Sequence, residues 1–320
     1  MSSPVKRRSL LLVPPLLAAA PVAAWPLAAC GSGEPEPSGR LRIATGSQTA
    51  VYYVYGGAIA SLIRERLPKV QPTVLVTAAS AQNVTMILQG SAEVGFTQAD
   101  IAADTPDAPR SLTALARLYD DYVHLVARRT GPIRTLADLI GHRVSIGAAG
   151  SGTGITANRL LSVGLAGLPG TVQKFQYGLD ASAAALKAGS IDAFFFSGGL
   201  PVQAIATLAQ SVTLRLVDLH NYVEPLREKY GEYYTDRVVP RSTYSGVEAA
   251  QTIGIPNYLV VRASMAEPMA FALTKLLFDG RDTLSKAHPA GARLNVRAAI
   301  STPPLNLHSG AARYYRTVKV

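Results

Sequence analysis

Residues 144–156, with the sequence VSIGAAGSGTGIT, constrain the fold of this chain more than any other stretch. Val144, Ser145 and Ile146 predict a short buried strand, the glycines that follow predict a tight turn, and a helix is expected to run on to about residue 162. A helix that starts after such a turn points unpaired backbone N–H groups and the positive end of its dipole at one place. The stretch therefore predicts a site for a small anion.

A nucleotide and a small carboxylate are the two candidate ligands for this site. A phosphate loop of the GxxxxGK[ST] type needs lysine after Gly152, and Thr153 stands there instead. Residues 152–157 fit a bare GxGxxA pattern, which alone is weak evidence for a dinucleotide. The hydroxyl groups of Ser151 and Thr153 and the backbone amides of residues 152–154, Gly152 among them, suit a carboxylate, so we expect a solute site here. The alternative is an ordinary tight turn between a strand and a helix.

The first 29 residues are expected to be a secretory leader. A basic segment at residues 6–8 precedes an apolar run that prolines interrupt, which disfavours a membrane-spanning helix. The run ends in LAACG, residues 27–31, which resembles a bacterial lipobox and implies cleavage before Cys30 and lipidation of its sulfur. Residues 30–40 are expected to form a flexible tether. The paired arginines also resemble a twin-arginine signal, so general secretory and twin-arginine export both remain open.

Charge and composition argue against several classes of function. The leader holds three of the 31 basic residues and none of the 21 acidic ones, so the mature chain has a net charge of +7. Its basic residues are scattered, a pattern that does not predict nucleic-acid binding. With Cys30 lipidated no free thiol remains, the histidines show no metal-ligand spacing, and no GxSxG motif is present. We therefore expect no metal, no cofactor and no enzymatic activity.

Strands followed by polar turns and helices recur along the chain. Three such units are predicted first, with strands at residues 41–45, 74–77 and 94–97. A second series begins after a strand at residues 122–126. Repeated units of this kind predict a parallel α/β sheet, whose strand ends share the edge where ligands bind.

The two series predict two α/β lobes. Lobe I is expected to comprise residues 41–125 plus 257–320, and lobe II residues 126–256, because extended segments near residues 126 and 256 would cross between them. Two lobes joined by two strands form a clamp that can close around a ligand. We expect the mature chain to be a monomer.

Three further predictions concern single elements. Residues 112–119 and 122–127 are predicted as separate strands, and residues 133–140 as a helix. Ser80 is predicted as the N-cap of a helix that covers residues 82–89.

Polar side chains follow the predicted strands of lobe I, and we expect them to face the ligand. Asp100 suits the ammonium group of an amino acid, although an N-cap role in a short helix explains it equally well. The candidates of this kind are Ser47, Gln48, Ser80, Gln82, Asn83, Gln98 and Asp100.

Aromatic residues near the strand ends supply further candidates. Of Tyr52 and Tyr53, one is expected to cover the ligand and the other to pack in the core, and the sequence does not distinguish them. Tyr177 and Phe196, at strand ends in lobe II, are expected to supply a phenol and an apolar wall. Aromatic residues are more often part of a core than of a site, which is the alternative here.

Seven stretches in the right order resemble the TAXI group of solute-binding proteins, which serve tripartite TRAP-type transporters. They are residues 44–46 with Tyr52, Tyr53, Gly56 and Gly57; Ser80 with Gln82, Asn83 and Gly90; residues 95–100; residues 147–153; residues 191–194 with residues 198–201; Thr243 with Tyr244; and residues 307–315. Together they span nearly all of the mature chain.

This resemblance implies an α/β, two-lobed, periplasmic-binding-protein-like (type II) clamp with a two-strand hinge. It implies capture of glutamate, glutamine or a dicarboxylate, delivery to a TRAP-type membrane permease, and a rim or hinge contact for Tyr244. The chain departs from the family pattern in three places: residues 47–51 lack the usual glycines, Ala81 stands where a glycine is expected, and Glu93 replaces an aspartate. The first two departures put the identity of the solute in doubt more than the fold.

These features predict an exported solute-binding protein that a lipid on Cys30 holds at the outer face of the cell membrane. Two other functions fit the same clamp: a receptor that signals to a membrane partner, and an enzyme, for which no nucleophile–base or metal constellation is recognisable. The neighbouring genes would distinguish uptake from sensing. A ligand recovered chemically unchanged would exclude catalysis.

Overall fold

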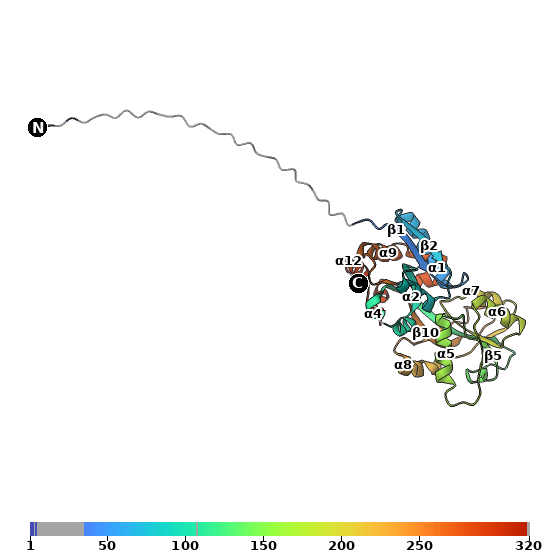
Figure 1. Cartoon of the computed structure of the whole chain (residues 1–320). Helices are drawn as coiled ribbons and strands as arrows, with labels where there is room; N and C mark the ends of the chain where they lie inside the picture. The colour runs from blue at the N-terminus through green and yellow to red at the C-terminus, as the bar shows by residue number, and fades with distance from the viewer. Residues whose placement is uncertain (3, 5–34, 107, 319–320) are drawn as a thin grey trace. The chain divides into compact units, whose positions relative to one another are not determined.

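The computed structural model describes residues 1, 2, 4, 35–106 and 108–318. Residues 35–320 form one compact unit (Figure 1), and the account below concerns this unit alone. The predicted lipidation site, Cys30, and nearly all of the predicted leader lie outside the described residues.

One mixed sheet of ten strands runs through the described residues, in the order β2-β1-β3-β10-β4-β7-β5-β6, with β8 paired to β4 and β9 paired to β10. The strands are β1 (Gly39–Ala44), β2 (Val70–Leu75), β3 (Val94–Gln98), β4 (Leu112–Arg128), β5 (Arg143–Ser145), β6 (Gln173–Phe175), β7 (Ala193–Gly198), β8 (Leu214–Leu216), β9 (Thr235–Val239) and β10 (Ala250–Arg262).

Helices connect these strands. The α-helices are α1 (Val51–Arg66), α2 (Ser80–Gln89), α3 (Ala99–Asp104), α4 (Ala108–Ser111), α5 (Gly152–Gly164), α6 (Leu179–Ala188), α7 (Gln203–Ala209), α8 (Val223–Tyr230), α9 (Glu267–Asp279), α10 (Arg281–Ala287), α11 (Val296–Ala299) and α12 (Ser309–Thr317). The 3₁₀ helices are η1 (Ala137–Leu139), η2 (His220–Tyr222) and η3 (Pro289–Arg293). Among the described residues, none of the helices combines the length and the apolar character needed to cross a bilayer.

The sheet has two parallel parts, and two long antiparallel strands join them. Strands β2, β1 and β3 are parallel to one another, as are β6, β5 and β7. Between these parts, β10 pairs with β3 and β4 pairs with β7, both antiparallel, and β4 and β10 pair with each other. The predicted α/β fold with two crossing strands is therefore confirmed. The residue limits of the two lobes stay a prediction.

Three predictions about single elements were wrong. Residues 112–119 and 122–127 form one strand, β4, because Asp120 and Asp121 continue the ladder opposite Pro256 and Ile255 instead of ending it. Residues 133–140 contain only the short 3₁₀ helix η1.

Ser80 is the first residue of α2, whose N-cap is Ala79, and no side chain caps that helix end. The Ser80 hydroxyl instead lies 3.2 Å from the Tyr52 hydroxyl and accepts a hydrogen bond from the Gln98 amide. The side chain that was expected to close a helix end therefore joins elements around the candidate site.

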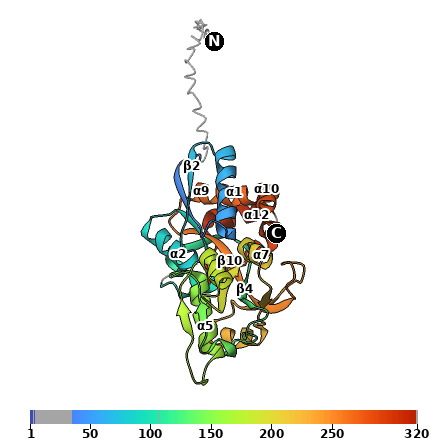
Figure 2. The same ribbon diagram turned by 90° about the vertical axis from the view of Figure 1, so that its right-hand side faces the viewer.

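Four apolar clusters form the core of the unit. The largest lies where α1, α9 and α12 pack over β1, β3 and β4, and Figure 2 shows these helices close together. His308 is buried at the start of α12, where Nδ1 accepts a hydrogen bond from the Gly310 amide and Nε2 lies 3.0 Å from the Met265 carbonyl oxygen. His308 therefore has a structural role at the start of α12.

Two adjacent glycines in α1 provide a test of this packing. A Cβ at Gly56 would lie 2.6 Å from Thr45 Cγ2, a buried atom, whereas a Cβ at Gly57 would meet nothing within 4 Å. We expect Gly56→Ala to lower the free energy of unfolding by about 1–3 kcal/mol through overpacking. The matched Gly57→Ala should raise it by up to about 1 kcal/mol through helix propensity. Urea denaturation of both variants measures the difference, and equal effects would contradict the packing described.

Candidate functional site

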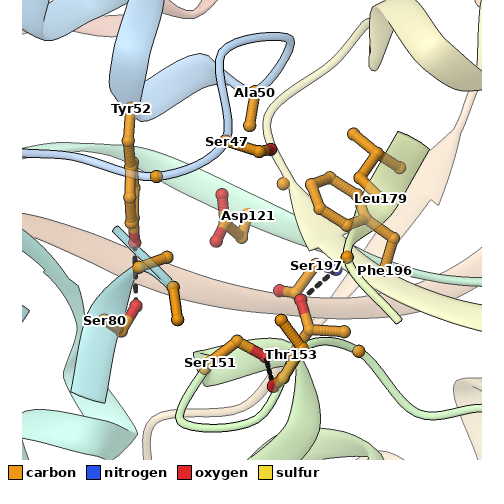
Figure 3. Close-up of a pocket in the computed structure, with 18 of the residues that line it drawn as sticks. Ser47, Ala50, Tyr52, Ser80, Asp121, Ser151, Thr153, Leu179, Phe196 and Ser197 are labelled. Carbon is orange, nitrogen blue, oxygen red and sulfur yellow. Dashed lines mark hydrogen bonds between the residues drawn. The ribbon is translucent and has the colours of Figure 1, made fainter. Parts of the chain in front are cut away.

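A cavity of about 80 Å³ lies where the two parallel parts of the sheet meet (Figure 3). Its walls come from the turns that follow β1, β2, β5 and β6, from the ends of β3 and β7, and from the middle of β4. The carboxyl ends of the strands in each parallel part share one edge, and the two parts run in opposite directions, so these two edges face each other across the cavity.

Four helix N-termini point at this cavity. Its lining includes the first residue of each helix: Val51 of α1, Ser80 of α2, Gly152 of α5 and Leu179 of α6. The first backbone N–H groups of a helix have no acceptor within the helix, and the helix dipole places partial positive charge there. Four such ends create a field that favours a negatively charged group.

Nine of the fifteen predicted ligand residues line the cavity. They are Ser47, Tyr52, Ser80, Gln98, Ser151, Gly152, Thr153, Tyr177 and Phe196. Of the two adjacent tyrosines, Tyr52 faces the cavity, where its ring stacks on Phe96 with centroids 5.0 Å apart and its hydroxyl donates to Asn257 Oδ1. Tyr53 is absent from the lining.

Of the two hydroxyl groups expected to donate to a carboxylate, that of Ser151 is already engaged and that of Thr153 keeps its proton free. Ser151 Oγ donates to the Ala148 carbonyl oxygen at 2.7 Å and caps α5 by accepting from the Gly154 amide at 3.0 Å. Thr153 Oγ1 accepts from the Ser197 amide at 3.1 Å, which leaves its hydroxyl proton for a ligand. The anion-binding capacity of this turn therefore lies mainly in the backbone amides at the start of α5.

Asp121 places one carboxyl group in the cavity wall, and Figure 3 shows it pointing into the open space. Its Oδ2 accepts from Gln98 Nε2 at 3.0 Å, while its Oδ1 is buried and has no hydrogen-bond partner among the described residues. Burial raises the pKa of Asp121 to about 7, although hydrogen bonds from Asn257 and Gln98 oppose the rise. Asp121 is thus a buried acceptor with a vacant lone pair.

Gln98 carries a second vacant acceptor. Its Nε2 donates to Asp121 and, at 2.6 Å, to Ser197 Oγ on β7, whereas its Oε1 is buried without a partner in the described part of the chain. A buried acceptor without a donor is costly, so a ligand that donates hydrogen bonds would be favoured here. Among the described residues, Asp121 is the one charged residue in the cavity lining.

Six predicted ligand residues lie away from the cavity lining: Gln48, Tyr53, Gln82, Asn83, Asp100 and Tyr244. Asn83 is fully buried, and its side-chain amide donates to the carbonyl oxygens of Thr45 and Phe96, so it holds β1 and β3 together at the rim. Gln82 Oε1 accepts from the Ala78 amide, which fixes the turn before α2. Their contact with ligand stays a prediction, and in this structure they support the residues that line the cavity.

Tyr244 belongs to the structural support of β4. Its hydroxyl accepts from the Val202 amide at 3.0 Å and lies 3.0 Å from His124 Nε2. Because burial lowers the pKa of His124 to about 4, the imidazole is neutral, and with Nδ1 donating to Tyr122 its Nε2 accepts from the phenol.

Asp100 is the centre of a buried polar cluster instead of a free carboxylate. Its Oδ2 accepts from Arg159 Nη1 of α5 at 3.0 Å and from the Tyr234 hydroxyl at 2.9 Å. Its Oδ1 accepts from the Ile101 amide at 2.9 Å. Burial raises the pKa of Asp100, while the Arg159 charge opposes that rise. The cluster fixes α5, and with it the amides at the cavity, to the segment that follows β3.

Three important lining residues were not found from the sequence: Asp121, Tyr119 and Ser197. Asp120 and Asp121 interrupt an apolar segment, and by itself such an interruption predicts the end of a strand. Two carboxylates inside an apolar strand pattern are a signal for a buried functional group, because ionised side chains are rarely buried without a purpose.

No group of three or more potential metal-ligating side chains occurs among the residues that the structure describes. The polar groups around the cavity are hydroxyls, amides and one carboxylate. Such a set can orient a small polar molecule and match its charges.

A family model described as the NMT1-like family matches residues 43–318. The fold resembles the periplasmic aliphatic sulphonate binding protein SsuA from Escherichia coli, with 18% identity over 88% of this chain and 83% of that chain and a TM-score of 0.50. It also resembles a putative L-cystine ABC transporter from Listeria monocytogenes, with 14% identity over 78% of this chain and 93% of that chain and a TM-score of 0.51.

A third similar structure is a histidine kinase sensor domain with similarity to periplasmic binding proteins, with 15% identity over 80% of this chain and 96% of that chain and a TM-score of 0.51. At such identities the likeness concerns the fold alone. The predicted periplasmic-binding-protein-like α/β fold is therefore confirmed.

Replacing Asp121 by asparagine should change how stability depends on pH. The folded state holds the Asp121 proton more tightly than an unfolded chain does, so the stability of the ligand-free protein falls as pH rises from about 4 to about 7. We expect Asp121→Asn to remove this loss of stability, which amounts to about 4 kcal/mol at most. The melting temperature of the variant, relative to that of wild type, should therefore be higher at pH 8 than at pH 5.

Asp138→Asn provides the control. Hydrogen bonds from the backbone N–H groups of Arg134 and Thr135 lower the pKa of Asp138, so it stays ionised in both states between pH 5 and pH 8. Its melting temperature relative to wild type should not change over that range. A flat difference for Asp121→Asn as well would show that the carboxyl group is not desolvated as described.

Proposed function

We propose that this chain, which belongs to the NMT1-like family, is an extracytoplasmic solute-binding protein. Its solute would be a small zwitterion, such as an amino acid, captured between the two lobes. This family membership and the confirmed fold support the general role. The class of solute rests on the charge pattern of the cavity.

One observation carries this proposal: four helix N-termini face a cavity whose one charged lining residue is the acidic Asp121. The amides at the start of α5 would receive the carboxylate of the solute. The vacant oxygens of Asp121 and Gln98 would receive its ammonium group. Of the solutes suggested by the sequence, glutamate and glutamine satisfy both requirements. A dicarboxylate without an amine would leave both acceptors vacant and bring a like charge to Asp121.

Contacts across the cavity support capture by closure. Thr49 Oγ1 donates to the Asp180 carboxylate at 2.8 Å, Gln98 Nε2 donates to Ser197 Oγ, and the Gln82 amide donates to the Gly150 carbonyl oxygen at 3.3 Å. Each contact joins a residue of the predicted lobe I to one of the predicted lobe II. Closure of this kind excludes water and strengthens the polar contacts of an enclosed solute.

Delivery to a membrane permease completes the proposed role. We propose that a lipid on Cys30 anchors the chain at the outer face of the membrane and that a TRAP-type permease receives the solute. The lipobox and the stretches that resemble the TAXI group support these two points. Signalling to a membrane partner is the alternative, since the same fold occurs in a histidine kinase sensor domain.

A thermal-shift panel of amino acids and their 2-hydroxy and 2-oxo analogues tests the class of solute. A solute at 100 times its dissociation constant should stabilise the protein by about 2.7 kcal/mol. We expect an amino acid to do so and its analogues without nitrogen to bind at least tenfold more weakly. In Asp121→Asn, the difference in affinity between the amino acid and its analogues without nitrogen should be smaller than in wild type. If the analogues bound as tightly as the amino acid, the proposal that the solute is a zwitterion would be wrong. If no compound stabilised the protein, the solute-binding role would be wrong.

Gly152→Ala tests closure. A Cβ at Gly152 would lie 2.1 Å from Gln98 Oε1 and 2.9 Å from Ser80 Oγ, so the two sides of the cavity could not meet as they do here. We expect the variant to fold, to lose at least tenfold in solute affinity and to show a larger radius of gyration by small-angle X-ray scattering. Gly57→Ala, whose added methyl group faces open space, is the control. Unchanged affinity in Gly152→Ala would refute the assigned geometry.

A further inference from the structure

A second, polar cavity of about 400 Å³ lies beside β4, and its charged lining residues are Arg117, Asp120, Arg237 and Arg293. Successive side chains of a strand point to opposite faces of its sheet. Asp121 lines the first cavity and Asp120 the second, and Tyr119 belongs to the lining of both, so the two cavities are neighbours along β4.

The charges of this second cavity do not cancel. Arg117 Nη2 donates to Asp120 Oδ1 at 2.6 Å, and Arg237 Nε donates to Asp120 Oδ2 at 3.2 Å, so both carboxylate oxygens are occupied. Two guanidinium groups against one carboxylate leave a net charge of +1. Arg293 is exposed, has no ion-pair partner among the described residues, and brings the total to +2.

The arginines come from different parts of the fold. Arg117 lies on β4 and Arg293 on η3, both in the predicted lobe I. Arg237 lies on β9, which pairs with the half of β10 that belongs to the predicted lobe II. An ion that contacts all three would therefore connect the two sides of the hinge.

We propose that this cavity is a second ligand site, which binds a small oxyanion such as sulfate or phosphate and thereby couples to closure of the clamp. Guanidinium groups present paired N–H donors that match the oxygens of such anions, and a partly enclosed cavity reduces screening by salt. Asp120 holds Arg117 and Arg237 in place, so the anion meets donors that are already oriented.

Anion binding would be coupled to closure of the clamp because Arg237 belongs to one predicted lobe and Arg117 and Arg293 to the other. The distances between these arginines therefore change when the angle between the lobes changes. An anion that binds one angle better shifts the population toward it. By reciprocity the anion and the solute change each other's affinity by the same factor. The anion site itself does not depend on the proposed function, whereas the coupling rests on it.

Isothermal titration calorimetry of the full chain with sodium sulfate tests the site. Sodium chloride holds the ionic strength constant during the titration. We expect saturable binding of one sulfate per chain and at least a tenfold weaker affinity in Arg293→Ala. Arg297→Ala removes the same charge from an exposed arginine that does not line the cavity, and it should bind sulfate as wild type does. Unchanged melting temperatures show that both variants fold.

Two outcomes would overturn the site: no saturable binding of sulfate, or equal loss in the two variants, which would indicate attraction by net charge alone. A second titration measures the affinity of the solute with sulfate and with chloride at equal ionic strength. We expect the affinity for the solute in sulfate and in chloride to differ severalfold in wild type and to be equal in Arg293→Ala. Identical solute affinities would overturn the coupling. Failure to find any solute would overturn the proposed function but would leave the sulfate titration as an independent result.

Discussion

The antiparallel pairing of β4 with β10 is the interaction on which the rest of the structure depends. β10 also pairs with β3 of one parallel part and β4 with β7 of the other, so the ladder between β4 and β10 joins the two parts. The same ladder fixes which side of β4 each residue faces. Asp121 reaches the first cavity and Asp120 the second because neighbouring side chains of a strand point to opposite faces of the sheet.

Much of this arrangement could be predicted from the sequence. Repeated strand–turn–helix units predicted the sheet, and the glycine-rich turn before α5 predicted an anion-suited helix end, because both signals are local. Ser47, Ser80 and Gln98 were found by the same reasoning, since residues that follow parallel strands converge at one edge.

The rest could not be predicted because it depends on pairing between distant segments. Asp121 reaches the cavity only because β4 continues past Asp120 in register with β10, about 135 residues later in the chain. Ser151 and Thr153 line the cavity, but the groups that bond to their hydroxyl oxygens lie in the folded turn and in β7. In the sequence Asp100 suits an ammonium group, but in the folded chain Arg159, on another helix, binds its carboxylate.

The raised pKa of Asp121 has a consequence for how the protein would bind its solute. A carboxyl group with a pKa of about 7 is about half protonated at neutral pH. An ammonium group beside it would favour the ionised form, so under the proposed function each solute that enters expels part of a proton. Solute and hydrogen ions would then compete for one oxygen atom, and acidity outside the membrane would itself act as an inhibitor of uptake.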